Sequence, residues 1–383
     1  MNGNPRVVIT GVGVVTPLGN TTEALWRALC AGESAVREWP DLVAGGYRCA
    51  QACRMPAFES DPLRRGRALG IAAAEQAVQH AGLTLPENTG VFIGSTLGES
   101  MAFERAAEGE AIDLSEFRVP SFTAGVRERF KLSGLHQSLA TACAAGNYAV
   151  GAALAALRNG RCDVALAGGA EPFSRLSLVG FSRSRAMASD RCRPFDANRT
   201  GMLLGEGAAM FVLELAEAAL QRGAVPLAEV VSLGLSCDAH HPTAPQPEGL
   251  GMRAAMQAAL DGAGIAPQAI DWVNAHGSGT RASDAAEAKA LRSLFGNALP
   301  TVSGSKGALG HALGAASAIE LAVCVQGLHK QTVPPTPGHE QPEAEGGIAC
   351  TRAPLVKHLR WVLNNAFAFG GVNSALLLRA WAA

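Results

Sequence analysis

The sequence predicts an α/β protein in which two similar halves form one large layered core. Apolar strands alternate with Ala-rich helices along the 383 residues, as they do in layered α/β folds. The 44 glycines allow helices to pack closely against sheets. The same order of helix, strand and turn also occurs twice, about 180 residues apart, which indicates an internal duplication.

The first strand begins at residues 7–9, and we expect the glycine-rich stretch after it to form a turn. Gly11 and Gly13 resemble the start of a dinucleotide-binding loop. In such a loop a third glycine and the start of a helix should follow, but Pro17 and Gly19 interrupt the pattern. A dinucleotide-binding oxidoreductase is therefore disfavoured.

Helix and strand signals continue along the chain. Thr21 is a typical N-cap residue, and the apolar residues Leu25, Trp26 and Leu29 follow it at helical spacing. The pattern further predicts helices over 69–81 and about 143–158, strands over 90–94, 136–142 and 162–167, and a glycine-rich turn with a strand over 205–215.

The internal duplication is visible in two pairs of segments. Residues 76–95 and 257–278 each run from an Ala-rich helix through Ala-Gly and a proline into a strand that ends near Gly-Ser. Residues 136–158 and 300–329 each contain a strand, a turn of small residues and a helix. We therefore predict a duplicated α/β unit with a boundary near residues 222–228. A chance likeness between Ala-rich helices is the alternative.

Composition disfavours several classes of protein. The formal net charge of −1 provides no long-range attraction for nucleic acid or an anionic membrane surface. We find no apolar run of the roughly 18 residues that a membrane span needs, and the first residues lack a signal-peptide pattern. The nine scattered cysteines are odd in number, which argues against a disulfide framework and favours a reducing, cytoplasmic location.

We expect no metal site. Cys49 and Cys53 are four residues apart, but no second close Cys or His pair completes a zinc site. His240 and His241 are adjacent without a visible third ligand, so we interpret them as part of a loop.

Cys143 is the first candidate for catalysis. It lies between a predicted strand and a predicted helix, in the stretch Ser138-Leu-Ala-Thr-Ala-Cys-Ala-Ala-Gly-Asn. That arrangement resembles a nucleophile elbow, in which a sharp turn exposes the side chain. The N-terminus of the helix would favour a thiolate, and its N–H groups could bind an oxyanion. A buried, unreactive cysteine is the alternative.

Two histidines follow predicted strands in the second half of the chain. His276 and His311 are both surrounded by Gly, Ser and Ala, which leave room for a ligand. Sites in α/β proteins lie where strand ends face a common crevice, so these histidines and Cys143 are candidates for one site. A structural, hydrogen-bonded histidine is the alternative for each one alone.

At these residues the sequence resembles the β-ketoacyl-acyl carrier protein synthases of the thiolase superfamily, most closely the FabF type (synthase II). The resemblance covers nearly the whole chain. It depends on motifs that occur in family order and spacing: Ile9-Thr-Gly-Val-Gly, Thr141-Ala-Cys-Ala-Ala-Gly, Ala167-Gly-Gly-Ala-Glu, Arg193-Pro-Phe-Asp, Leu204-Gly-Glu-Gly-Ala, Asn274-Ala-His-Gly-Ser-Gly-Thr, Gly304-Ser-Lys-Gly-Ala-Leu-Gly-His and Phe369-Gly-Gly-Val-Asn.

The resemblance implies a thiolase-like, five-layered αβαβα fold with two pseudo-duplicated halves. We assign residues 1–224 to the half with the nucleophilic cysteine, and residues 225–383 to the half with both histidines and a gating loop. It implies an acyl carrier protein as the partner that delivers substrate. It also implies a homodimer, or a heterodimer with a homologous ketosynthase or chain-length-factor subunit. No cofactor is implied, because phosphopantetheine arrives on the carrier.

The resemblance also implies the chemical roles. Cys143 would take the acyl chain as a thioester. Malonyl-carrier would then lose carbon dioxide, and His276 and His311 would donate hydrogen bonds to the enolate that remains. Lys306 and Glu320 would position the histidines, where the sequence alone would suggest a surface ion pair of little value.

Further positions carry over from the family motifs. The backbone N–H groups of Cys143 and Phe369 would bind the oxyanion that forms when the enolate attacks. Ser278 and Thr280 match positions that bind the phosphopantetheine arm, where an ordinary Gly/Ser turn is the alternative. Asp238 matches a mobile loop that faces the gate.

The gate departs from the family pattern. The family segment reads Gly-Phe-Gly-Gly-Thr-Asn, but here it is Ala368-Phe-Gly-Gly-Val-Asn, which contains Phe369 and Gly370. Alanine resists positive φ, and Val372 removes a hydroxyl, so the motion of Phe369 could differ. The stretch between Ser95 and Phe117 is also shorter than usual. A secondary-metabolite type II pathway is thus at least as well supported as fatty-acid synthesis.

Two alternatives stay open at the level of sequence. A chain-length-factor-like partner subunit would lack the nucleophile, but Cys143, His276 and His311 are all present. A thiolase or acyltransferase would use the same fold, but the histidine pair and Lys306 favour decarboxylative condensation.

Overall fold

We describe the protein from a computed structural model, which covers residues 5–381. The first half contains β1 (Val7–Val15), α1 (Thr22–Cys30), β2 (Arg37–Glu38), α2 (Pro40–Ala44), β3 (Gln51–Ala52), α3 (Arg65–Ala81), β4 (Gly90–Gly94), α4 (Ser100–Ala107), α5 (Pro120–Phe130), β5 (His136–Leu139), α6 (Ala145–Arg158), β6 (Val164–Glu171), α7 (Arg175–Arg183), β7 (Gly207–Leu215) and α8 (Ala216–Gln221).

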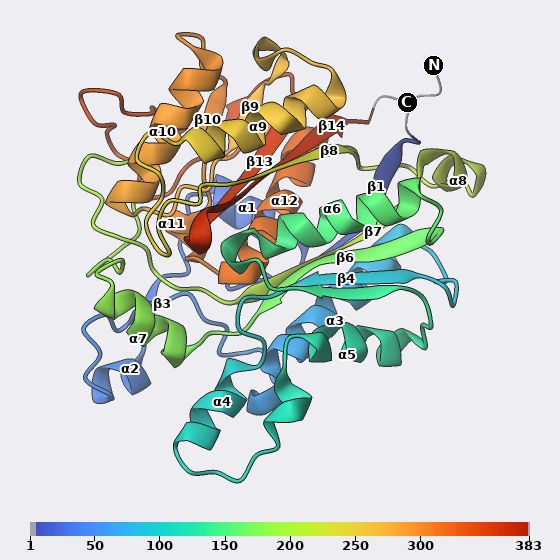
Figure 1. Cartoon of the computed structure of the whole chain (residues 1–383), viewed down its shortest axis with the longest axis horizontal. Helices are drawn as coiled ribbons and strands as arrows, with labels where there is room; N and C mark the ends of the chain where they lie inside the picture. Colours follow the sequence, from blue (N-terminus) through green and yellow to red (C-terminus); the bar gives the residue numbers. More distant parts are fainter. Residues whose placement is uncertain (1–4, 382–383) are drawn as a thin grey trace.

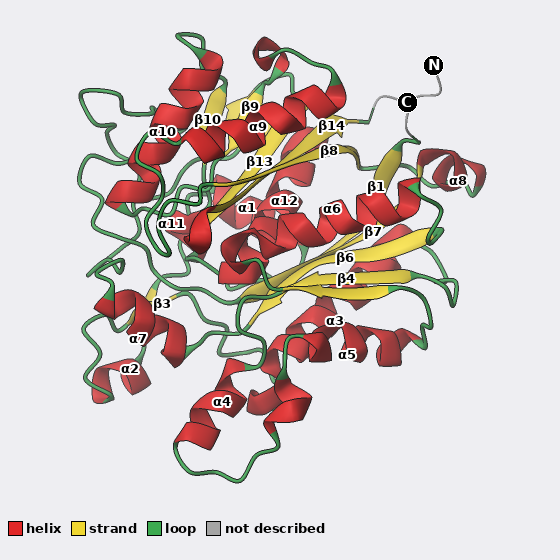
Figure 2. Ribbon diagram, viewed as in Figure 1, coloured by secondary structure: helices red, strands yellow, loops and turns green. Residues whose placement is uncertain are grey.

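The second half contains β8 (Ala228–Cys237), α9 (Leu250–Ala263), β9 (Trp272–Asn274), α10 (Arg281–Phe295), β10 (Thr301–Ser303), α11 (Lys306–Leu309), α12 (Leu313–Lys330), β11 (Thr332–Val333), β12 (Leu355–Val356), β13 (Trp361–Ala368) and β14 (Val372–Ala380). Thr21 caps α1 as predicted, because its side chain accepts a hydrogen bond from the Ala24 N–H. Figure 2 shows the helices and strands on the same view as Figure 1.

The strand order confirms the predicted duplication. The first half forms the order β5-β4-β6-β7-β1, and the second half forms β10-β9-β13-β14-β8. In both halves the first three strands are parallel and the last two neighbour pairs are antiparallel. The halves meet where β1 and β8 pair antiparallel, with Val7 opposite Val230. The division at residue 224 falls between α8 and β8 and stays a prediction.

The elements stack in five layers, as the resemblance implied (Figure 1). Helices α9 and α10 cover the outer face of the second half's strands, and α3 and α5 cover the outer face of the first half's strands. Helices α6 and α12 form the middle layer, and the largest apolar cluster joins them to strands of both halves. The middle layer therefore belongs to both halves at once.

The predicted glycine-rich turn after residue 9 was wrong, because β1 continues to Val15. Gly11 and Gly13 lie inside this strand, under helix α3. A Cβ atom at Gly11 would lie 2.0 Å from the Ala77 carbonyl oxygen, and one at Gly13 would lie 2.0 Å from the Ala73 carbonyl oxygen. These glycines allow helix α3 to approach the strand closely. They form neither a turn nor a dinucleotide-binding loop.

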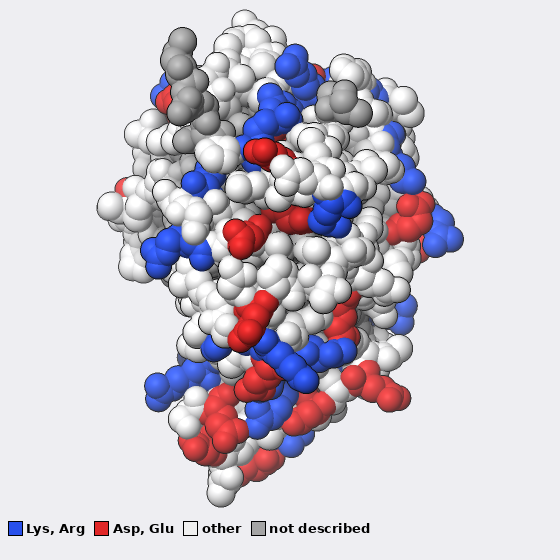
Figure 3. Space-filling model, turned by 90° about the vertical axis from the view of Figure 1, so that its right-hand side faces the viewer, with Lys and Arg blue, Asp and Glu red and all other residues white. Residues whose placement is uncertain are grey.

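The surface charge is mixed on the face shown in Figure 3, where basic and acidic residues alternate. Many charged side chains of the molecule form ion pairs, such as Arg64 with Glu116 and Arg175 with Glu108. Among residues 5–381, no helix is long and apolar enough to cross a membrane.

Candidate active site

Three of the five predicted catalytic residues share one cavity of about 530 Å³. Cys143, His276 and His311 all line it, and they come from three different strand–helix connections. The cavity walls also include Asp238, Ser278, Thr280, Ala368 and Phe369. The structure therefore brings together residues that lie more than 200 positions apart in the sequence.

Cys143 sits in a single 3₁₀ turn, Ala142–Ala144, that leads directly into α6. The preceding Ala142 has φ of 48°, which is the strained turn expected of a nucleophile elbow. Gly146 allows α6 to approach α12, since a Cβ atom there would lie 2.7 Å from the Ala318 nitrogen. The sharp turn and the close backbone approach are thus both present.

Two influences act on the Cys143 thiol in opposite directions. Burial raises the pKa of the Cys143 thiol to about 12, although the positive charge of Lys306 lowers it. The buried carboxylates Glu171 and Glu320 raise it further. Loss of water around a thiol that sits within the turn is therefore the largest influence on it. That the N-terminus of α6 favours a thiolate stays a prediction.

The two histidines lie side by side, with ring centroids 5.3 Å apart and planes at 72°. Nδ1 of His311 accepts a hydrogen bond of 3.1 Å from the Leu313 N–H, which leaves the ring proton on Nε2. Burial lowers the pKa of both histidines well below 6.5, and the nearby Lys306 lowers it further. Both rings are therefore neutral and able to donate a hydrogen bond.

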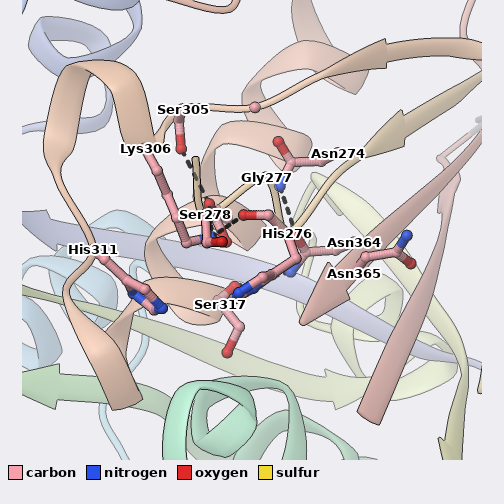
Figure 4. A network of polar contacts seen from close by, with 12 residues as sticks. Asn274, His276, Gly277, Ser278, Ser305, Lys306, His311, Ser317, Asn364 and Asn365 are labelled. Carbon is pink, nitrogen blue, oxygen red and sulfur yellow. Dashed lines mark hydrogen bonds and ion pairs between the residues drawn. The ribbon is translucent and has the colours of Figure 1, made fainter. Parts of the chain in front are cut away.

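Lys306 and Glu320 form a buried ion pair beside the histidines, not a surface pair (Figure 4). The Lys306 ammonium donates to the Glu320 carboxylate at 2.6 Å and to the His276 carbonyl oxygen at 2.6 Å. Each side chain is only 2% exposed. Because Lys306 bonds the backbone of His276, it restricts where that histidine can lie, as the resemblance implied.

Ser278 and Thr280 lie next to each other on the cavity wall. Their hydroxyl oxygens are 3.0 Å apart, and the Ser278 hydroxyl also donates to the Asp284 carboxylate at 3.3 Å. Gly277 and Gly279 beside them have φ of 44° and 78°, so the segment is a tight turn that places both residues on the cavity wall.

The gating loop has its positive φ angles at Gly370 (82°) and Gly371 (71°), and not at Ala368, whose φ is −117°. The methyl group of Ala368 therefore causes no backbone strain in this conformation. Phe369 is 37% exposed, and its ring packs at 59° against the ring of Phe181 of α7, with ring centroids 5.3 Å apart.

Asp238 contacts the gate directly, as predicted. Its backbone N–H donates to the Gly371 carbonyl oxygen at 2.9 Å, and its carboxylate accepts from Asn373 at 2.7 Å. The other carboxylate oxygen accepts from the Gln246 N–H at 2.9 Å. Asp238 thus joins the strand after the gate to the loop that follows β8.

Three features of the site were missed by sequence reasoning. Phe181 gave no signal, because nothing in its neighbourhood marks it as a partner of the gate. Glu287 on α10 accepts from the N–H groups of His276 and Gly277, each at 2.9 Å. The third is a set of hydrogen bonds among the buried amide side chains of Asn147, Asn274 and Asn364.

A buried amide network joins the catalytic segments. The Asn364 side chain donates to the Asn147 side chain at 2.9 Å and to the Ser317 carbonyl oxygen at 2.9 Å. It accepts from Asn274 at 2.8 Å, two residues before His276. Asn147 lies on the helix that follows Cys143, and Asn364 lies on the strand that leads to the gate. Figure 4 labels Asn274, Ser317 and Asn364 of this network near His276.

The residues that we excluded as metal ligands do not line the cavity. Nδ1 of His241 accepts from the Thr243 and Ala244 N–H groups within its own loop. Within residues 5–381, no group of three or more His, Cys, Asp or Glu is arranged to hold a metal ion. All nine cysteines, including Cys49 and Cys53, are free thiols.

The five layers and the Cys–His–His cavity together define a condensing enzyme of the thiolase-like class. The β-ketoacyl synthase N-terminal domain family matches residues 4–219, and the C-terminal domain family matches residues 227–340. The chain therefore belongs to the β-ketoacyl synthase family.

Individual relatives agree with this. The chain is 36% identical to 3-oxoacyl-[acyl-carrier-protein] synthase 2 of Rhizobium meliloti (strain 1021) over 423 residues, which cover 98% of this chain and 99% of that protein. It is 34% identical to Nodulation protein E of the same organism over 401 residues, again 98% and 99% of the two chains. The solved ishigamide ketosynthase/chain length factor superposes with a TM-score of 0.93 at 36% identity, over 99% of this chain and 100% of that one.

Proposed function

We propose that this protein is a β-ketoacyl-acyl carrier protein synthase that condenses malonyl-carrier with an acyl chain held on Cys143. The observation that carries the proposal is the shared cavity, in which a cysteine faces two neutral histidines. Neutral imidazoles suit an enolate, because they stabilise developing negative charge as hydrogen-bond donors without giving up the proton.

In the first half-reaction, the Cys143 sulfur attacks the thioester carbonyl of acyl-carrier. The carrier leaves as its thiol and takes the proton that Cys143 loses, so no net charge stays in the buried site. This balance matters because burial raises the pKa of the Cys143 thiol to about 12 and so disfavours a charged sulfur. The N–H groups of Cys143 and Phe369 are assigned to the oxyanion of the tetrahedral intermediate.

In the second half-reaction, malonyl-carrier loses carbon dioxide, and the remaining enolate attacks the acyl-Cys143 thioester. Nε2–H of His311 and the ring of His276 would donate to the enolate oxygen. The new carbon–carbon bond forms as the carbon–sulfur bond to Cys143 breaks, and the Cys143 thiolate then takes a proton from solvent. Lys306 and Glu320 act by holding His276, and Ser278 and Thr280 would bind the phosphopantetheine arm.

The partner proteins follow from this reaction. An acyl carrier protein would deliver both substrates, and phosphopantetheine would arrive on it, so the protein would need no cofactor of its own. In one solved structure, a type II PKS acyl-carrier protein is in complex with its ketosynthase, and that structure is 26% identical to this chain. We infer a homodimer or a heterodimer with a homologous subunit, and with nine free cysteines we place it in the cytoplasm.

A secondary-metabolite pathway is favoured over housekeeping fatty-acid synthesis by one further observation. Ala368 and Val372 both replace the family residues in the gate, where the acyl chain would enter. The similarity to the ishigamide ketosynthase/chain length factor also supports a secondary-metabolite pathway. A non-catalytic chain-length factor is disfavoured, because Cys143, His276 and His311 all line the cavity.

The direct test incubates the purified protein with radiolabelled malonyl-carrier, with and without acyl-carrier, and analyses the carrier by intact mass. We expect a β-ketoacyl-carrier two carbons longer than the acyl donor, and release of carbon dioxide. The absence of product with every acyl donor and with a co-expressed homologous subunit would disprove the proposal. Product only in the presence of that subunit would establish a heterodimer.

A further inference from the structure

Glu171, the last residue of β6, has a carboxylate that lies buried between the two halves of the molecule. One oxygen accepts from the Thr96 N–H at 2.6 Å and from the Gly314 N–H at 2.9 Å. The other accepts from the Leu97 N–H at 3.0 Å and the Ser95 hydroxyl at 3.3 Å. The carboxylate therefore holds the loop after β4 against the first turn of α12.

The contact between Glu171 and Gly314 leads to the proposed catalytic residue His311. Gly314 directly follows Leu313, whose N–H donates to Nδ1 of His311. Leu313 has φ of 43°, in the left-handed region that costs a residue with a side chain about 1 kcal/mol. A conformation with this cost persists only where neighbouring contacts hold it. The bond from Gly314 to Glu171 is such a contact.

The glycine at position 314 is required by the same contact. A Cβ atom there would lie 2.5 Å from the Thr96 nitrogen and 2.6 Å from the Glu171 carboxylate. The α12 backbone therefore approaches the carboxylate as closely as a glycine permits. This close approach makes the link between Glu171 and the Leu313 turn a short, fully buried one.

We propose that Glu171 is a positioning residue for decarboxylation, which fixes the Leu313 turn and thereby the orientation of His311. With the turn in place, the Leu313 N–H occupies Nδ1 and the ring proton remains on Nε2, toward the substrate. The inference rests on the proposed function, because His311 needs this orientation only if it donates to an enolate. Glu287 holds the backbone of His276 in a comparable way.

The chain provides a matched control in Glu99. Its carboxylate is also buried, accepts two backbone N–H groups at the start of α3, from Gly66 and Arg67, and has its pKa raised to about 7 by burial, as Glu171 has. The contacts of Glu99 are to α3 and not to α12. If activity depends only on having a buried carboxylate, Glu99→Gln and Glu171→Gln should lose it alike. If it depends on the orientation of His311, only Glu171→Gln should lose it.

The test compares wild type, Glu171→Gln and Glu99→Gln in separate assays of acyl transfer to Cys143 and malonyl-carrier decarboxylation. For Glu171→Gln we expect decarboxylation kcat to fall about 10-fold or more with KM little changed, since small misplacement of a catalytic group has effects of this size. Acyl transfer should stay within about threefold. Glu99→Gln should keep the wild-type ratio of the two rates. In ¹⁵N-histidine NMR spectra, the His311 signal should show a single Nε2–H tautomer in wild type and a mixture in Glu171→Gln.

Defined results would overturn the inference. One is a folded Glu171→Gln protein with wild-type decarboxylation and an unchanged His311 tautomer. Another is an equal loss of acyl transfer, because Glu171 would then act through the Ser95–Leu97 loop. If Glu171→Gln fails to fold, Glu171→Asp replaces it: a selective loss of decarboxylation supports the inference and wild-type rates overturn it. Absence of condensation in the wild type would instead refute the proposed function.

Discussion

The two halves of the molecule share a strand order but carry different chemistry at corresponding strand ends. In the first half, the connection from β5 to α6 presents the thiol of Cys143. In the second half, the corresponding connection from β10 to α12 is longer, forms α11, and presents His311 together with Lys306. The connection after β9 presents His276, whereas the one after β4 is the Ser95–Leu97 segment held by Glu171.

This difference shows how a duplicated scaffold supports two steps of one reaction. The fold places both sets of strand ends around one cavity, and the connections determine which groups reach it. In the proposed mechanism, the first half supplies the group that carries the acyl chain, and the second half supplies the groups that stabilise the enolate. Changes confined to one half should therefore affect one half-reaction more than the other.

The largest effect is expected from Cys143→Ala. Condensation and formation of the acyl-enzyme should be abolished, because alanine has no nucleophile, while the fold should persist since alanine fits the turn. Intact-mass analysis after incubation with acyl-carrier measures the adduct directly. An adduct that still forms on the Cys143→Ala protein would place the nucleophile elsewhere.

The next largest effect is expected from His276→Ala and His311→Ala. Decarboxylation of malonyl-carrier should fall about 100-fold or more, the typical loss when one oxyanion donor is removed. Acyl transfer to Cys143 should fall less, because that step belongs to the first half. Release of labelled carbon dioxide and acyl-enzyme formation measure the two steps, and an equal loss of both in a folded variant would contradict the division of roles.

The pH dependence of decarboxylation should also distinguish the chemistry of the second half from that of the first. Burial and Lys306 lower the pKa of His276 and His311 below 6.5, so both rings stay neutral as the pH falls from 8 through 6.5. Decarboxylation should therefore stay constant over this range and decrease only at lower pH, where the lowered pKa values are reached. Stopped decarboxylation assays on acylated enzyme across this pH range measure the direction of the pH dependence. A decrease centred at pH 6.5 would show that the rings titrate as exposed histidines do.

The smallest effect is expected at the gate. Ala368→Gly should widen the range of acyl chains accepted or speed the first acylation by a few-fold at most, with decarboxylation nearly unchanged. The effect is small because Ala368 is unstrained in this conformation, so the methyl matters only if the loop passes through positive φ as Phe369 swings. Single-turnover acylation with short and long acyl-carriers measures it, and identical rates would make the substitution neutral.

The sequence allowed the duplication, the cavity residues and the family to be predicted, because each depends on local motifs. Properties that depend on packing between distant parts of the chain could not be predicted from it. Gly11 and Gly13 looked like a turn, since only the packing of α3 explains them. The pKa of Cys143 depends on burial, which no motif records. Glu171 stood in a recognised motif, but its contact with Gly314 spans 143 positions.

The shared middle layer has a consequence for how the protein folds. Helices α6 and α12 pack against strands of both halves, and the pair Asn147–Asn364 closes the seam with buried hydrogen bonds. A fragment ending near residue 224 would leave the inner apolar surface of α6 exposed, and the remaining fragment would leave that of α12 exposed. We therefore expect the two fragments to be insoluble when expressed singly and to recover structure only when co-expressed. Unfolding of the intact chain should occur in a single cooperative transition.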